Sequence, residues 1–400
     1  MKNDLQKKTN SASQSRRRFL QDSSLMMAGG LSLSRAAHGA GDNVIRAGLV
    51  GCGRQGIRIS QELLRLGHQV EIRALADAFG DRLQAAYRGL RSRFGKQVQV
   101  PLERRFVGLN GLTGLLESDV DLVVLATPPA FRPAQMTAAF GAGKHVFAEP
   151  PLAVDVAGVD QLLSANEHPQ TDGLCIDVGF QRRHEDRYVS LARRIAAGAI
   201  GDVRCCQFVW IGNLIKPTPR GKLSEFEHQL RNWQCHRWLG GNPMLEKQIH
   251  SLDFVNWFLQ ESPLRVQLKT GSHTAGSDSA ELKLVYPSVV VSSRAESSAR
   301  AGSRSSECVV GTQGSAQLDA GIIRDRQQQV VWKSPGGGGS GAPNQLANLI
   351  EAIQGARRLN RVESGAFSTL TALLGHDVNP GEALARLVAL SPGSRPAVVS

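Results

Sequence analysis

Apolar runs and helical stripes alternate along the N-terminal part of the chain. The apolar run at residues 44–50 is typical of a short buried strand, and apolar residues then recur at helical spacing over residues 57–66. A second apolar run, residues 70–76, ends at Asp77. A strand, a helix and a strand in this order predict a βαβ unit, in which the two strands are parallel.

The same alternation continues to about residue 180. We predict helices over residues 82–94, 110–117, 133–141 and 154–166, and strands over residues 120–126 and 145–148. The run 120–126 is almost entirely apolar, as expected for a parallel sheet that helices cover on both faces. The pattern therefore predicts an α/β fold class, with a doubly wound parallel sheet in a first domain of residues 43–180.

The pattern changes after a predicted helix at residues 188–197. Residues 203–210 alternate between apolar and polar side chains, and further strands separated by Ser/Gly-rich turns follow over residues 264–318. We predict a second, α+β domain over residues 181–335. A glycine-rich loop at 336–343 then leads to helices within residues 344–400 that pack back on the first domain.

The turn between the first strand and helix has the pattern G-x-G-x-x-G, formed by Gly51, Gly53 and Gly56, with Arg54 and Gln55 between them. Such a turn lets a pyrophosphate approach bare backbone at a helix N-terminus. Asp77 follows Gly56 by about 20 residues, the spacing of the acid that binds the adenosine ribose. We therefore predict a bound dinucleotide. The acid favours NAD over NADP, and the nearby Arg82 keeps NADP as the alternative.

The net charge of +12 is concentrated in part at the N-terminus. Residues 15–21, Ser-Arg-Arg-Arg-Phe-Leu-Gln, resemble the twin-arginine export motif, and a weakly apolar stretch and small residues follow. We predict a signal peptide over residues 1–40, the twin-arginine export machinery as a partner, and a periplasmic or otherwise exported location. The alternative is a disordered basic tail. The stretch is too short and polar to be a stable membrane anchor.

Composition excludes other functions. Aromatic residues make up only 5% of the chain, which argues against nucleic-acid binding by base stacking. The six cysteines show neither C-x-x-C nor zinc-like spacing, so no metal site is predicted.

Candidate chemistry in the second domain lies on a predicted helix. Glu246 and His250 are four residues apart and share one helix face, where a carboxylate can orient an imidazole that acts as a general base. The alternative is a surface or capping histidine. Just before this helix, Asn232 and Trp233 suit a carbohydrate, although a tryptophan is equally common as a core anchor.

Together these motifs resemble the Gfo/Idh/MocA family, relatives of glucose–fructose oxidoreductase and inositol dehydrogenase. The residues that carry the resemblance are 51–56 (GCGRQG), 76–77 (AD), 126–129 (ATPP), 143–153 (GKHVFAEPPLA), 179–183 (GFQRR) and 198–202 (GAIGD). The resemblance implies an N-terminal Rossmann domain and a C-terminal domain with an open, mainly antiparallel sheet. It also implies hydride transfer between NAD(P) and a sugar, polyol or derivative, and an interface on the sheet that suits a homo-oligomer.

The resemblance assigns roles to further residues. Thr127, Pro128 and Glu149 lie at the carboxyl ends of strands and would contact the cofactor. His250 aligns with the family's base and Glu246 with its acidic partner, whereas Arg182, Asn232 and Trp233 align with substrate contacts.

One position departs from the family. The E-K-P motif has a lysine near the nicotinamide, and this chain has Pro150 there. Because proline can neither donate a proton nor carry a charge, two alternatives stay open. The protein could be a redox-neutral, NAD-dependent glycosidase or epimerase, or a non-catalytic relative that binds cofactor and sugar.

Overall fold

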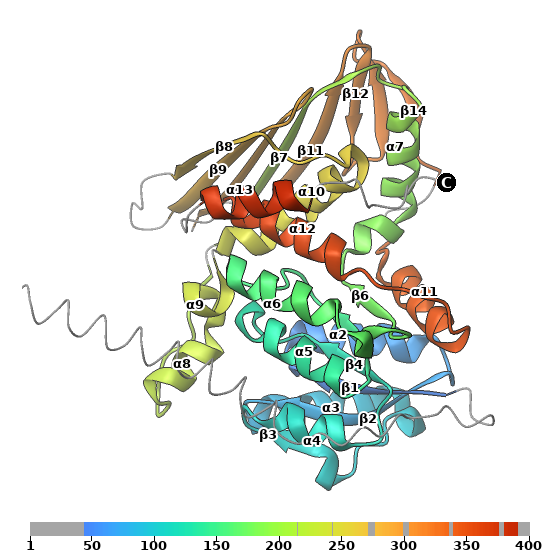
Figure 1. Ribbon diagram of the computed structural model, residues 1–400, viewed down its shortest axis with the longest axis vertical. Helices are drawn as coiled ribbons and strands as arrows, with labels where there is room; N and C mark the ends of the chain where they lie inside the picture. Colours follow the sequence, from blue (N-terminus) through green and yellow to red (C-terminus); the bar gives the residue numbers. More distant parts are fainter. Residues whose placement is uncertain are drawn as a thin grey trace, which may run out of the picture.

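The computed structural model describes residues 44–213, 215–241, 243–270, 277–298, 304–335, 339–375 and 380–390. The predicted export signal at residues 1–40 lies outside the described residues, as do residues 336–338 of the predicted glycine-rich loop. Two sheets, one above the other in Figure 1, divide the rest of the chain into the two domains that the pattern predicts.

The first sheet has six parallel strands in the order β3-β2-β1-β4-β5-β6. Its strands are β1 (Ile45–Val50), β2 (Val70–Asp77), β3 (Arg105–Val107), β4 (Leu122–Leu125), β5 (His145–Ala148) and β6 (Ile176–Val178). Its helices are α2 (Arg54–Arg65), α3 (Gly80–Phe94), α4 (Gly111–Glu117), α5 (Arg132–Gly141) and α6 (Val156–Asn166). The order reverses beside β1, which places the carboxyl ends of β1 and β4 at the switch point where such sheets bind ligands.

The strands of the first sheet follow directly from their composition. All four side chains of β4, Leu-Val-Val-Leu, are buried, as they must be in a sheet covered on both faces. The predicted Rossmann domain is confirmed. Short 3₁₀ turns connect its elements: η1 (Gly95–Gln97), η2 (Leu102–Arg104), η3 (Pro129–Phe131) and η4 (Pro169–Thr171).

The second sheet has eight strands in the order β14-β13-β12-β11-β7-β10-β9-β8 and is mainly antiparallel, as the resemblance implies. Among the described strands only the neighbours β7 and β10 pair in parallel. The strands are β7 (Val203–Asn213), β8 (Arg265–Thr270), β9 (Ser277–Val285), β10 (Val290–Ser298), β11 (Arg304–Gly311), β12 (Gly314–Gln317), β13 (Ile322–Asp325) and β14 (Val330–Lys333). In β7 the predicted alternation is present: Cys206 and Phe208 are buried, whereas Arg204 and Gln207 are exposed.

Helices join the two sheets into one body (Figure 1). Between the sheets lie α10 (Pro243–Leu259), α12 (Val362–Leu373) and α13 (Pro380–Ala389), while α7 (Asp186–Ala196) flanks the second sheet and η5 (Gln181–His184) connects the domains. One apolar cluster runs from Leu125 in the first sheet through Phe254 of α10 to Phe208 in the second. The helix α11 (Ala342–Gln354) packs on α2 of the first domain.

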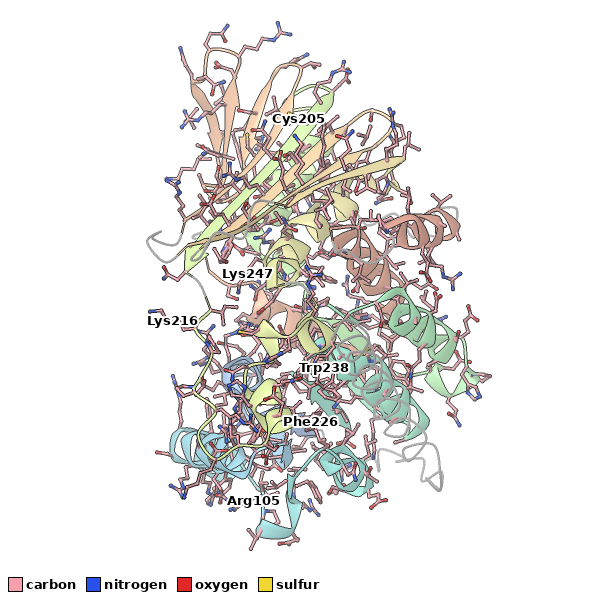
Figure 2. All side chains as sticks on the ribbon, turned by 90° about the vertical axis from the view of Figure 1, so that its left-hand side faces the viewer. Arg105, Cys205, Lys216, Phe226, Trp238 and Lys247 are labelled. Carbon is pink, nitrogen blue, oxygen red and sulfur yellow. The ribbon has the colours of Figure 1, made fainter. Side chains whose placement is uncertain are left out.

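A segment of the second domain reaches down along the first. Residues 215–241, which we call the strap, connect β7 to α10 and contain α8 (Glu225–Arg231), η6 (Trp233–Cys235) and α9 (Arg237–Gly240). Figure 2 shows its side chains Phe226 and Trp238 beside the lower domain, below Lys247. The strap places second-domain residues at the edge of the predicted dinucleotide site.

Candidate functional site

The glycine turn after β1 has the geometry that a dinucleotide requires. Gly51 has a φ of 95°, a conformation that side chains disfavour, and a Cβ there would lie 2.7 Å from the backbone of Ala126. A Cβ on Gly56 would lie 2.1 Å from the Gly51 carbonyl oxygen. Beside Gly53, by contrast, the space is open, and α2 begins there without a side-chain cap. A phosphate group fits this open space at the helix N-terminus.

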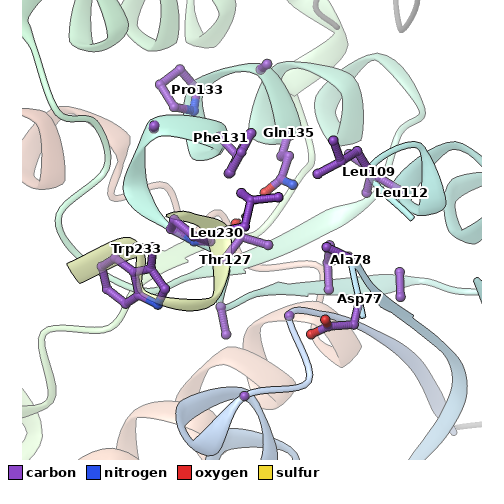
Figure 3. Close-up of a pocket in the computed structure, with 18 of the residues that line it drawn as sticks. Asp77, Ala78, Leu109, Leu112, Thr127, Phe131, Pro133, Gln135, Leu230 and Trp233 are labelled. Atoms are coloured by element: carbon purple, nitrogen blue, oxygen red, sulfur yellow. Dashed lines mark hydrogen bonds between the residues drawn. The ribbon is translucent and has the colours of Figure 1, made fainter. Parts of the chain in front are cut away.

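Asp77 lies at the end of β2 and points into the same pocket (Figure 3). The side chain is buried, and its two carboxylate oxygens accept hydrogen bonds from the backbone N–H groups of Cys52 (2.7 Å) and Phe79 (2.8 Å). Burial raises the pKa of Asp77, and these two hydrogen bonds oppose the shift. Each oxygen keeps a second lone pair, so the carboxylate can still accept a ribose hydroxyl.

The pocket has a volume of about 370 Å³ and joins the glycine turn to Asp77. Thr127 and Pro128, which follow β4, line it as predicted. Its opposite wall comes from the strap: Leu230 and Trp233 face the pocket from the second domain (Figure 3). Trp233 therefore lies at the cofactor pocket, and no contact in the described residues places it beside His250.

Asn232, the neighbouring candidate substrate contact, binds backbone groups within the strap. Its amide group donates to the carbonyl oxygens of Thr218 (3.1 Å) and His228 (3.0 Å), and its side-chain oxygen accepts from the Thr218 N–H (2.7 Å). These bonds tie the end of α8 to the start of the strap. The sequence shows a polar residue at this position. It cannot show that the hydrogen-bonding atoms of this side chain are bound to nearby backbone groups.

Glu149, at the end of β5, is held beside the glycine turn. Gln55 of α2 donates to Glu149 Oε2 at 3.0 Å, and burial raises the pKa of the carboxyl while this bond opposes the shift. A Cβ on Gly179 would lie 3.0 Å from Glu149 Oε1, so the end of β6 adjoins it as well. The sequence-predicted residues Gln55 and Glu149 are thus brought together, whereas Arg54 is exposed at the first position of α2.

A buried cation that sequence reasoning missed acts on this carboxylate through its charge. Arg132, at the start of α5, is 4% exposed and donates to the carbonyl oxygens of Thr127 and Pro151. Burial lowers its pKa to about 10, and the charges of Glu149 and Glu246 oppose the shift. Its Nε has no hydrogen-bond partner. The sequence signal that could have pointed to Arg132 is an arginine in the first turn of an apolar helix, where the helix dipole disfavours a cation.

His250 lies on α10, where the two domains meet. Its ring is 6.2 Å from that of Phe180, edge to face, and Phe180 follows Gly179 at the end of β6. Burial lowers the pKa of His250 to about 3, and the positive charges of Arg182, Lys247 and Arg58 add to this effect. The imidazole is therefore neutral at physiological pH, and its Nδ1 has no hydrogen-bond partner.

The predicted pairing of Glu246 with His250 is not formed in the structure. Glu246 instead accepts from Gln234 Nε2 at 2.7 Å and lies 3.8 Å from Lys247 Nζ. The i, i+4 spacing puts both side chains on one helix face. The Glu246 carboxylate is nevertheless bound by the side-chain amide of Gln234, from η6, and lies near Lys247. Arg182, which contributes to the electrostatics of His250, pairs with the buried Glu307 at 2.7 Å and donates to Ser251 at 3.1 Å.

Two family models match the chain in succession. The first, an oxidoreductase family with an NAD-binding Rossmann fold, covers residues 45–171, and the second, the GFO/IDH/MocA C-terminal domain, covers residues 188–317. The chain belongs to the Gfo/Idh/MocA oxidoreductase family. The prediction of NAD as the cofactor is confirmed, since this family binds NAD on the fold that carries the glycine turn and Asp77.

Relatives in the family act on sugars and polyols. Inositol 2-dehydrogenase of Acidothermus cellulolyticus is 24% identical over 237 residues, which is 59% of this chain and 60% of that protein. Aldose-aldose oxidoreductase of Caulobacter crescentus, solved with glycerol, has a TM-score of 0.63 at 18% identity and covers 86% of this chain and 98% of its own. Levoglucosan dehydrogenase, solved with NADH, has a TM-score of 0.61 at 18% identity, covering 86% and 97%.

Among the described residues, no group of three or more His, Cys, Asp and Glu side chains could hold a metal ion. Within the same residues, no helix is both long and apolar enough to cross a bilayer.

Proposed function

We propose that this protein is an exported NAD-dependent oxidoreductase that interconverts a hydroxyl and a keto group on a sugar, polyol or derivative. The observation that carries the proposal is the chain of contacts at the domain junction. Gln55 of the glycine turn holds Glu149, Glu149 adjoins Gly179, and the next residue, Phe180, contacts the His250 ring. A proton acceptor thus lies beside the cofactor-binding edge of the sheet.

His250 takes the proton from the substrate hydroxyl in this proposal. Bound NAD supplies the hydride acceptor, so the carbon loses a hydride and the oxygen a proton, and a carbonyl forms. The neutral imidazole has a lone pair for the proton, and its pKa must rise from about 3 toward the working pH when cofactor and substrate are bound, since a general base works best there. Positive charge from Arg182, Lys247 and Arg58 acts on the ring, and positive charge at this position also stabilises an alkoxide as the proton leaves.

Arg132 provides the fixed charge of the site. The family's lysine position is Pro150, and the guanidinium of Arg132 is bound to the carbonyl of the next residue, Pro151. It balances the buried Glu149 and holds together the loops after β4 and β5. Its role in this proposal is to position those loops, since no proton transfer is expected from an arginine.

Pro150 favours a second candidate, a relative that binds NAD and sugar without turnover. One experiment separates the two. The purified protein is screened at 340 nm with NAD and a panel of polyols, aldoses and their derivatives, alongside the His250→Ala and Pro150→Lys variants. Turnover that His250→Ala abolishes supports the oxidoreductase. Stoichiometric NAD binding with turnover only in Pro150→Lys supports the non-catalytic relative.

A redox-neutral reaction is a third outcome of the same screen. It gives no change at 340 nm, so the same incubations are also analysed for product by mass spectrometry. Product without accumulation of NADH, abolished by His250→Ala, would identify it.

Export through the twin-arginine route is proposed from residues 15–21 and is tested separately. The substitution of Arg16 and Arg17 by lysine should retain the full-length protein in the cytoplasm, as measured by fractionation and by the mass of the mature chain. A periplasmic product in the double variant would contradict the route.

A further inference from the structure

The strap closes the adenosine half of the dinucleotide pocket. Leu230 and Trp233 form the wall opposite Asp77, and Leu230 is buried in a small apolar cluster with Phe79 and Leu239. Figure 3 shows Leu230 and Trp233 on one side of the pocket and Asp77 with Ala78 on the other. A dinucleotide between these walls has second-domain residues across its path to solvent.

Polar contacts of Arg231 add to this apolar packing of the strap on the first domain. Arg231 pairs with Asp81 of α3 at 2.6 Å, and its guanidinium carbon lies 4.2 Å from the centre of the Phe79 ring. Arg82 donates to the backbone carbonyl of Arg231 at 3.3 Å. These contacts surround Phe79, whose backbone N–H binds Asp77. The attachment of the strap and the ribose-binding carboxylate therefore adjoin the same residue.

The polar attachment is weak, the apolar cluster of Leu230, Leu239 and Phe79 completes the contact, and the strap is internally firm. The Asp81 side chain is 63% exposed, so its ion pair with Arg231 is screened by water, whereas a stacked arginine adds a modest attraction. Within the strap, Asn232 binds the backbone of Thr218 and His228, and Ser224 and Glu227 form a capping box. Such a segment opens as one unit when its attachment breaks.

We propose that the strap is a gate over the adenosine half of NAD, closed by Arg231, and that it slows cofactor exchange. The inference rests on the proposed function because it requires a bound dinucleotide. A gate differs from an ordinary contact in its kinetics, since it obstructs both entry and exit. Its loss therefore raises the association and the dissociation rate constants together. The loss of a simple contact raises only the dissociation rate constant.

The test is stopped-flow fluorescence with NADH as the probe. Association is followed on mixing, and dissociation is followed after bound NADH is challenged with excess NAD. Arg231→Gln removes both attachments and should raise the dissociation rate constant about tenfold, with a rise of severalfold in the association rate constant. Asp81→Asn removes only the exposed pair and should raise both rate constants by about two- to fivefold.

The matched control is Arg220→Gln. Arg220 is also on the strap and pairs with Glu225 at 3.2 Å, but both side chains are more than half exposed and neither lines the pocket. Its rate constants should equal those of the wild type.

Three results would overturn the gate: unchanged rates in Arg231→Gln and Asp81→Asn, a faster dissociation with unchanged association, or an equal effect of Arg220→Gln. In each case the wild type still binds NADH and the proposed function stands. A wild type that binds neither NADH nor NAD would instead refute the proposed function and the gate together.

Discussion

The two halves of the site are built in different ways. In the adenosine half, the glycine turn and Asp77 come from neighbouring stretches of sequence, the strap adds only the opposite wall, and both carboxylate oxygens of Asp77 accept hydrogen bonds from nearby backbone N–H groups. The reacting half brings together α2, α5, β5, β6 and α10, and it buries two polar nitrogens, His250 Nδ1 and Arg132 Nε, without partners. The first half follows a local motif, whereas the second depends on how distant segments pack. A buried nitrogen without a hydrogen-bond partner lowers the stability of the fold. Such groups are typical of functional sites.

The largest expected effect is on the reacting half. His250→Ala should lower the rate of hydride transfer by about 10²- to 10⁴-fold because it removes the positioned proton acceptor. The affinity for NADH, measured by fluorescence titration, should stay within about twofold. Equal losses in rate and affinity would mean that His250 serves the cofactor half instead.

The next effect is on stability. Arg132→Met should lower the free energy of unfolding by about 3 kcal/mol, because it leaves Glu149 uncompensated and two buried carbonyls unpaired. Urea unfolding measures the loss. The control is Arg386→Met, which removes a partly exposed pair with Asp160 and should cost less than about 1 kcal/mol. A similar cost for both variants would contradict the special role of the buried cation.

A smaller effect is expected in the adenosine half. Asp77→Asn should weaken NAD binding by about tenfold, since the amide cannot accept from Cys52, Phe79 and a ribose hydroxyl as a carboxylate does. Isothermal titration measures this affinity. Asp155→Asn is the control: Asp155 lines the same pocket and caps α6 through Gly158, and asparagine caps a helix equally well. An equal loss in both variants would show that charge in the pocket, and not the position of Asp77, governs binding.

The smallest effect concerns pH. The folded pKa of His250 is lowered to about 3 from an ordinary value near 6.5, so the unfolded chain binds the proton more readily. The stability that His250 contributes is present above pH 6.5 and is lost as the pH falls toward 3. Lys247→Met removes one positive neighbour and should raise this pKa by less than one unit, as measured by NMR titration of the ring. A lower pKa in the variant would contradict the effect of the Lys247 charge on His250.

Local patterns in the sequence predict most of the first domain and little of the reacting half. The strands of the parallel sheet follow from apolar runs and the glycine turn from its motif. The helix α2, however, begins at Arg54 and not at the first apolar position, Ile57, because backbone hydrogen bonds start before the apolar stripe. Helical spacing predicts that Glu246 and His250 share a face. It cannot predict that Gln234, from another element, binds Glu246.

Trp233 shows the same limit. A tryptophan next to an asparagine suits a carbohydrate, yet the packing of the strap on the first domain places this ring against the cofactor pocket. The sequence does not point to Arg132, because its role depends on two carboxylates from other parts of the chain. Glu149 follows β5, and Glu246 lies on α10. Residue type predicts possible chemistry, and only tertiary contacts decide which partner is present.

The strap and the helix that carries His250 are neighbours along one backbone. The hydrogen bond from Gln234 to Glu246 joins η6 of the strap to the first turns of α10. Swinging the strap outward therefore pulls on a covalent tether and strains this bond, four residues before His250. If the strap is the gate we propose, its opening would therefore also disturb the start of the helix that carries His250, so entry of the cofactor would be coupled to the position of the proposed base.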